Sequence, residues 1–344
     1  MKRTALNTAT LIAASVALNS RLGGMSLAAY DAPDDGAFAH DKVVEANASL
    51  FTESFFSEPL TGYAVGWKDP NDIAATLAFY APEVRVPRKF EYKEYVNAEE
   101  FYSDGDDDER ALGGEFGAVE YKSSKTVAKT VNRGLKICVD LDEVADHEGW
   151  REHYTGKLLR RLQRNSLRRA IALLSAGATN AAKTWDTTAG KDPDQDVITD
   201  LITAATASGI KPNRVGYGDT AFAKRALAHR AQTTAGGFSS AGMSLEQIAG
   251  VLGVDKVNVS KERFSTGGSK SEILSNLVLM FTALDGQDAE DPSNIKRFVT
   301  PTEGGGPVRV YERQISSKLY EIVVEHYELI KITSTLGLRK QTIS

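Results

Sequence analysis

The chain has 344 residues, of which 42% are hydrophobic and 25% are charged. These fractions exclude a chain that is disordered throughout, and the length allows two or three domains. The formal net charge of -5 excludes a general attraction to nucleic acid, so any such contact requires a local basic patch. The single cysteine, Cys138, excludes an internal disulfide and a cysteine-rich metal site, and its apolar surroundings predict a buried thiol.

The first 48 residues are interpreted as an N-terminal arm. They begin with two cations and continue with a mildly apolar stretch, which is also the pattern of a secretory signal peptide. Five polar residues interrupt that stretch: Asn7, Thr8, Thr10, Ser15 and Asn19. We therefore favour an arm ordered by a partner over a signal peptide. No stretch of the sequence is long and apolar enough to cross a membrane.

Residues 49–82 alternate aromatic clusters with turns, and their aromatic residues are expected in the core or at an interface, with the core favoured. These are Phe51, Phe55, Phe56, Tyr63 and Trp67. Residues 83–131 then predict a long β-hairpin, because two alternating segments flank a polar loop. An isolated two-stranded ribbon is marginal in water, so this hairpin requires a partner surface.

The loop of the hairpin is strongly acidic. Its acids are Asp104, Asp106, Asp107, Asp108 and Glu109. A calcium loop is one interpretation, but the glycine and glutamate spacing of an EF-hand is missing. We favour a solvated acidic loop or one that contacts another subunit.

Residues 150–175 predict one long helix, since leucines and alanines recur at three- and four-residue steps along one side. The expected buried residues are Leu158, Leu159, Leu162, Ala170, Leu173 and Leu174. Gly177 is expected just beyond its end. Five cations occupy the opposite side and form a basic ridge: Lys157, Arg160, Arg161, Arg164 and Arg168. Only Glu152 is near them in sequence, so an anionic surface is expected to face the ridge.

Residues 196–300 alternate helical and strand patterns and predict a separate α/β domain. Within it, Ser244 and Gln247 predict a capping box that starts a helix. The tail, residues 301–344, predicts a strand at VRVYERQ and a long strand from Tyr320 to Thr333.

Motifs for catalysis or metal binding are weak. Gly216 and Gly218 resemble a dinucleotide fingerprint but lack the downstream acid, so a plain turn from strand to helix is favoured. The segment GGSKS at residues 267–271 lacks the earlier glycine of a phosphate loop, and a turn is favoured there too. His147 and His153 are six residues apart, where a zinc helix requires four.

Taken in order, these parts resemble the major capsid proteins of tailed bacteriophages. The resemblance spans about residues 50–340 and is most specific in LEQIAGVLGVDKVNVSKERF and in the closing segments VRVYERQ and EIVVEHYELIKIT. It implies an α+β fold of the major capsid type. The parts are an N-terminal arm (1–48), a peripheral domain (49–82 and 132–195) with the spine helix, an extension loop (83–131), an axial domain (196–300) and closing strands that return to the peripheral domain (301–344).

The resemblance implies a structural protein without enzymatic activity, catalytic residues, cofactor or metal. Copies are expected to form pentamers and hexamers of an icosahedral shell around double-stranded DNA, assembled in the host cytoplasm and located in the virion capsid. Further partners would be portal, scaffolding or decoration proteins, and no membrane is involved. The basic ridge would face packaged DNA or acids of a neighbour. An encapsulin-type compartment and an α/β enzyme with a pocket near residues 216–219 remain alternatives.

Overall fold

The computed structural model describes residues 55–95, 124–144, 146–232, 235–286, 291–302 and 306–344. The predicted N-terminal arm, residues 1–48, and the predicted acidic loop, residues 104–109, lie outside the described residues. Among the described residues, no helix has the length and apolar composition needed to cross a bilayer.

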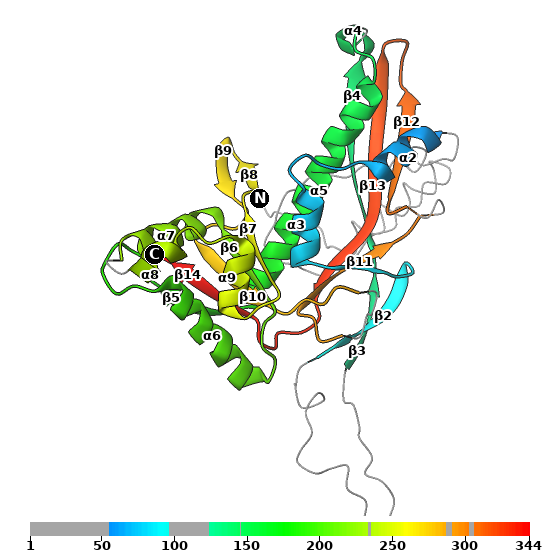
Figure 1. Cartoon of the computed structure of the whole chain (residues 1–344). Helices are drawn as coiled ribbons and strands as arrows, with labels where there is room; N and C mark the ends of the chain where they lie inside the picture. The colour runs from blue at the N-terminus through cyan, green and yellow to red at the C-terminus, as the bar shows by residue number, and fades with distance from the viewer. Residues whose placement is uncertain (1–54, 96–123, 145, 233–234, 287–290, 303–305) are drawn as a thin grey trace, which may run out of the picture. The chain divides into compact units, whose positions relative to one another are not determined.

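Helix α5, Trp150–Gly177, confirms the predicted spine helix (Figure 1). It runs two residues further than predicted, and Gly177 is its last residue instead of the residue beyond it. The amide of Ala178 still donates to the carbonyl of Leu174 and completes the last turn. The predicted apolar side is buried, with Leu173 half-buried against the core.

A five-stranded sheet lies against one side of α5 and is built around β13, Leu319–Ile332. β13 pairs antiparallel with β4 (Val131–Asp140), β11 (Ile295–Thr300) and β12 (Val308–Gln314), and β1 (Glu83–Arg85) pairs parallel with β11. The central place of the last long strand is therefore confirmed. We call this sheet the spine sheet.

The spine helix and spine sheet share an apolar core with helix α2, Glu58–Gly66. The core contains Leu60, Leu158, Leu159, Leu162, Val310, Ile322 and Val324. Phe56 and Tyr63, predicted to lie in the core, are instead 40% and 37% exposed.

The prediction of a buried thiol at Cys138 is wrong. Side chains alternate along a strand, and Leu135 and Ile137 of β4 pack against the core with α5. Cys138 therefore points to the opposite face, where it is exposed.

The predicted hairpin is present at its base as β2, Lys89–Glu94, paired antiparallel with β3, Ser124–Lys129. The base of the hairpin has apolar contacts within the chain. The ring centres of Phe90 and Tyr92 lie 4.6 and 5.4 Å from the ring centre of Phe298 on the spine sheet. At this end of the ribbon, the spine sheet of the same chain is the partner surface that the sequence predicted. Residues 96–123 lie outside the described part.

A second five-stranded sheet has the order β5-β14-β10-β6-β7. The strands are β5 (Thr179–Lys183), β14 (Arg339–Ile343), β10 (Leu277–Phe281), β6 (Arg214–Gly218) and β7 (Lys256–Ser260). Helices α6 (Pro193–Ser208), α7 (Asp219–Arg230) and α9 (Leu245–Leu252) contribute to its apolar core, and α8 (Ala235–Ser240) follows α7. We call this the axial sheet.

Three strands pair across the expected domain boundaries. Strand β5, expected in the peripheral domain, belongs to the axial sheet. Strand β14, expected to return with the tail to the peripheral domain, pairs with β5 and β10 in the axial sheet. Strand β11, expected in the axial domain, belongs to the spine sheet. Hydrophobic patterns within one segment identify a strand. They do not identify the strand it pairs with, because that depends on segments far away in the sequence.

Helix α3, Ile73–Tyr80, lies where the two sheets meet. The ring of Tyr80 stacks on Phe281 of β10 at 5.8 Å. Buried Arg214 of β6 donates to the carbonyls of Ala78 and Phe79 at 3.2 and 2.6 Å. One guanidinium therefore ties the axial sheet to the end of α3.

Candidate functional site

The five cations of the basic ridge lie along α5 but do not share one environment. Lys157 and Arg161 are exposed, whereas Arg160, Arg164 and Arg168 are half-buried. The difference follows from what each side chain meets in the fold.

Acids of the same chain pair with two of these arginines. Arg160 Nε lies 3.1 Å from Asp69 Oδ2, and Arg164 Nε lies 2.7 Å from Glu262 Oε2. Both acids are far from α5 in sequence, so the inspection of nearby residues missed them. The expected anionic surface is thus supplied, for these two positions, by the chain itself.

Aromatic rings hold two further cations. The guanidinium of Arg168 lies 4.0 Å from the centre of the Phe264 ring, and the ammonium of Lys157 lies 4.7 Å from that of Tyr154. Such cation–π contacts stabilise a cation without a counter-charge. Arg161 is the ridge member that makes no ion pair or ring contact with the described residues.

A buried charge network lies beneath the same helix, and the sequence analysis did not single it out. Glu328 of β13 is 1% exposed. It accepts hydrogen bonds from Ser166 at 2.9 Å and Arg169 at 2.8 Å, and Arg297 lies 3.6 Å away. The signal that could have revealed it is a set of glutamates within a strand predicted to be central, because such strands seldom bury unpaired charge.

Burial and the charges of this network determine which of its side chains are protonated. Burial acts to raise the pKa of Glu328, but positive charge on His326, Arg297 and Arg169 outweighs it and lowers that pKa. Burial lowers the pKa of neighbouring His326 to about 4; the charge of Glu328 opposes this, and Arg169, Arg297 and Arg133 add to it. His326 is therefore neutral at pH 7 while Glu328 is ionised.

A cavity of about 240 Å³ opens beside this network, between α2, α3, α5 and the spine sheet. Apolar walls from Trp67 and Leu159 face a polar end formed by Arg297, His326 and Glu328. This mixture suits ordered water or a small polar group. Ser166 also lines the cavity and donates to Glu328, whose oxygens are paired with Arg169 and Arg297 and therefore make a weak base.

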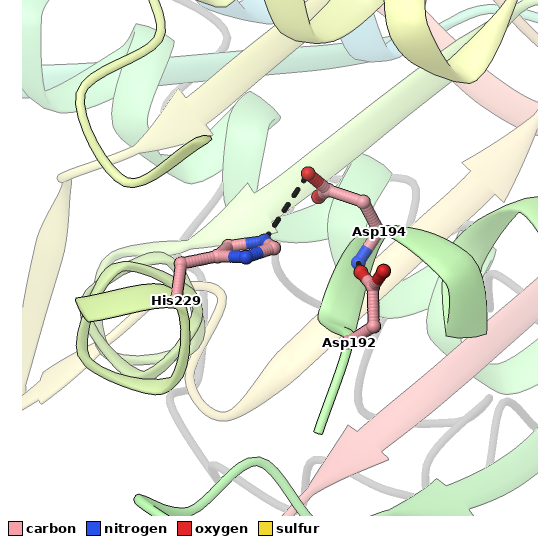
Figure 2. Close-up of side chains that lie close together, drawn as sticks. All are labelled: Asp192, Asp194 and His229. Atoms are coloured by element: carbon pink, nitrogen blue, oxygen red, sulfur yellow. Dashed lines mark hydrogen bonds and ion pairs between the residues drawn. The ribbon is translucent and has the colours of Figure 1, made fainter. Parts of the chain in front are cut away.

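A second cluster of acids and histidine lies in the axial domain (Figure 2). The ligand atoms of Asp192, Asp194 and His229 lie within 4.8 Å of one another, a spacing that could hold a metal ion. However, Arg225 binds both oxygens of Asp194, at 2.6 and 2.7 Å. His229 Nε2 lies 3.2 Å from Asp194.

Asp192 also has hydrogen-bond partners already. Its Oδ1 caps α6 by accepting from the amides of Asp194 and Gln195. A metal at this place would lie against the Arg225 cation, which repels it. The residues therefore fit a structural ion pair better than a metal ion. Burial acts to raise the pKa of Asp194. Hydrogen bonds and positive charge from His229 and Arg225 outweigh burial and lower that pKa.

The weak motifs are structural. Strand β6 runs directly into α7 at Gly218, as the favoured interpretation predicted. A Cβ at Gly218 would lie 1.8 Å from the carbonyl oxygen of Ser275, so the close approach of that backbone accounts for the glycine without a ligand. Gly267 and Gly268, with φ of 57° and 92°, form the turn between β8 (Arg263–Thr266) and β9 (Ser269–Glu272).

Two other predictions can be placed. The capping box of Ser244 and Gln247 is confirmed at the start of α9. His147 precedes α5, and His153 lies on it with its side chain exposed. Neither belongs to a potential metal cluster of the described residues.

Comparison with solved structures shows what the fold resembles. A phage-related protein from Bordetella bronchiseptica matches 83% of this chain and 96% of its own, with 17% identity and a TM-score of 0.61. A virus-like particle from Pyrococcus furiosus matches 84% and 100%, with 14% identity and a TM-score of 0.49. The capsid of the cyanophage P-SCSP1u matches 77% and 86%, with 10% identity and a TM-score of 0.48.

No protein-family model matches the sequence, and no curated protein matches it. The match to the phage-related protein, with its TM-score of 0.61, extends over most of both chains at low identity. At such identity it shows a shared α+β fold.

Proposed function

We propose that this chain is a shell-forming major capsid protein. Copies assemble into pentamers and hexamers of an icosahedral head that encloses the double-stranded DNA of a tailed phage. The observation that carries the proposal is the fold shared, over nearly the whole of that protein, with a solved phage-related protein. The order of parts along the sequence supports it independently.

The arrangement of surfaces is compatible with a structural role. Near residues 216–219, where the alternative enzyme would need its pocket, the backbone of residues 274–275 packs closely against Gly218. The buried charge clusters around Glu328 and Asp194 are paired within the chain and suit a rigid subunit.

In this proposal, only part of the basic ridge is available to contact DNA. Arg160 and Arg164 stabilise the subunit, whereas exposed Lys157 and Arg161 are the members that can meet packaged phosphate. Contacts of this kind are independent of base sequence and weaken with salt. The acidic loop, Asp104 to Glu109, is proposed to contact a neighbouring subunit.

Electron microscopy of the purified full chain tests the function. Closed shells of uniform diameter are expected, together with an early peak in size-exclusion chromatography. A monomer at all concentrations, salts and pH values tried, in the presence of co-expressed phage assembly proteins, would contradict the proposal.

The contents of the shells separate a capsid from an encapsulin-type compartment. Shells made during infection or induction are expected to hold nuclease-protected double-stranded DNA. A cargo enzyme in shells without a genome would favour the compartment. Portal, scaffolding or decoration proteins should be recovered with the capsid form.

A further inference from the structure

The ribbon of β2 and β3 presents a basic outer face. Its pairing places Lys89 opposite Lys129 and Lys93 opposite Lys125, while Phe90 and Tyr92 face the spine sheet. Exposed Glu91, opposite Val127, is the acid that β2 adds to this face, so lysines outnumber acids on it by four to one. Like charges directly opposite each other on two strands are destabilising. Lys89, Lys125 and Lys129 are exposed and make no ion pair with any residue that the structure describes. We call this surface the lysine face.

The far end of β4 has the opposite charge. The segment from Asp140 to Glu148 contains five acids: Asp140, Asp142, Glu143, Asp146 and Glu148. Lys318 pairs with Asp142 at 2.5 Å, but Glu143, Asp146 and Glu148 are exposed and lack an ion-pair partner within the described ranges. We call this surface the acidic end.

The two surfaces cannot neutralise each other in one molecule. Thr130 alone joins β3 to β4, and the acidic end begins at the last residue of β4 (Figure 1). Ten residues of strand separate them by about 30 Å, several times the screening length of about 8 Å at physiological salt.

We propose that the lysine face of one copy binds the acidic end of a second copy. The inference rests on the proposed shell function and names a contact within it. Because the two surfaces differ, the contact is heterologous: each copy offers one surface to the copy ahead and the other to the copy behind. Such contacts build closed rings when the rotation closes.

A protein partner fits the lysine face better than nucleic acid does. Val127 is 72% exposed between Lys125 and Lys129 on the same face of β3. The acidic end also carries apolar groups, since Leu319, paired with Asp140, is 37% exposed and nearby Ile315 is 47% exposed. Phosphates would satisfy the lysines but would leave Val127 in water.

Charge reversal tests the contact. The first variant, Lys125→Glu with Lys129→Glu, makes both surfaces acidic; the second, Glu143→Lys with Asp146→Lys, makes both basic. All four side chains are exposed, so far-ultraviolet circular dichroism and melting curves should match the wild type. The control, Lys261→Glu with Lys270→Glu, makes the same change of charge on exposed lysines elsewhere.

Assembly is measured by sedimentation velocity on nuclease-treated protein at low and high salt. Each reversed variant alone should need on the order of tenfold more protein to assemble, as expected for losing two or three exposed ion pairs. An equimolar mixture of the two should recover assembly, because each then meets its complement. The control should assemble like the wild type.

Three results would overturn the contact while leaving the shell proposal intact. They are normal shells from both reversed variants, no recovery in the mixture, and a loss that appears only as weaker binding of a duplex DNA probe. The last result would assign the lysine face to nucleic acid. Failure of the wild type itself to form shells would instead count against the proposed function.

Discussion

At the scale of single residues, His326 gives the protein a built-in sensitivity to acid. Its folded-state pKa is about 4, below its ordinary value of 6.5, because it is buried near Arg169, Arg297 and Arg133. Below pH 6.5 the unfolded chain binds a proton at this position that the folded chain does not bind. Stability is therefore complete above pH 6.5 and declines as the pH falls toward 4.

We predict that the free energy of unfolding falls by about 3 kcal/mol between pH 6.5 and pH 4 through this residue. Urea titrations at several pH values measure the fall. His326→Gln should make it smaller by that amount, whereas His153→Gln, at an exposed position, should not change it. Equal pH profiles for the wild type and His326→Gln would contradict the assignment.

At the scale of elements, the β8–β9 hairpin is attached to the spine helix through the basic ridge. Glu262, just before β8, pairs with Arg164, and Phe264 of β8 lies against Arg168. A two-stranded hairpin is marginal alone, so these contacts should hold it in place.

Arg164→Gln with Arg168→Gln should therefore loosen the hairpin without unfolding the chain. Hydrogen exchange of the amides from 263 to 272 is expected to accelerate about tenfold or more, as for a segment that opens locally. Exchange in the core of α5 should be unchanged. Arg161→Gln, which removes a neighbouring cation without such contacts, is the matched control and should leave the hairpin protected.

The same elements show how far sequence patterns reach. Periodicity within one segment predicted α5 and β13, because burial of one helix side or one central strand leaves a local signal. It could not predict that Asp69 and Glu262 meet Arg160 and Arg164, since those acids approach only after the chain has folded. Nor could it choose the face of Cys138 or the sheet that receives β14. Both depend on partners far away in the sequence.

At the scale of the whole molecule, Arg214 couples the axial sheet to the rest of the described chain. Its side chain is 2% exposed, donates to two carbonyls at the end of α3, and lies 2.6 Å from Asp285. Removing it takes a charged donor from those two carbonyls and leaves Asp285 paired with Lys256 alone. The free energy of unfolding should fall by about 3 kcal/mol, because two hydrogen bonds from a buried charged group are lost together.

The more specific expectation for Arg214→Met is a loss of cooperativity. Trp185 belongs to the core of the axial sheet, whereas Trp67 and Trp150 pack against the core of the spine sheet. Two probe versions of the protein, one retaining only Trp185 and one lacking it, then report the two halves separately. Their denaturation midpoints should coincide with Arg214 in place and move apart in Arg214→Met, because the polar link is lost and only the apolar cluster shared by α3, α5, β10, β11 and β13 still joins the sheets.

Arg339→Met, which removes a half-buried arginine within the axial sheet, should lower stability without separating the midpoints. Coincident midpoints in Arg214→Met would mean that the shared apolar cluster, which includes Tyr80 stacked on Phe281, is enough to couple the sheets, and that the arginine contributes stability alone.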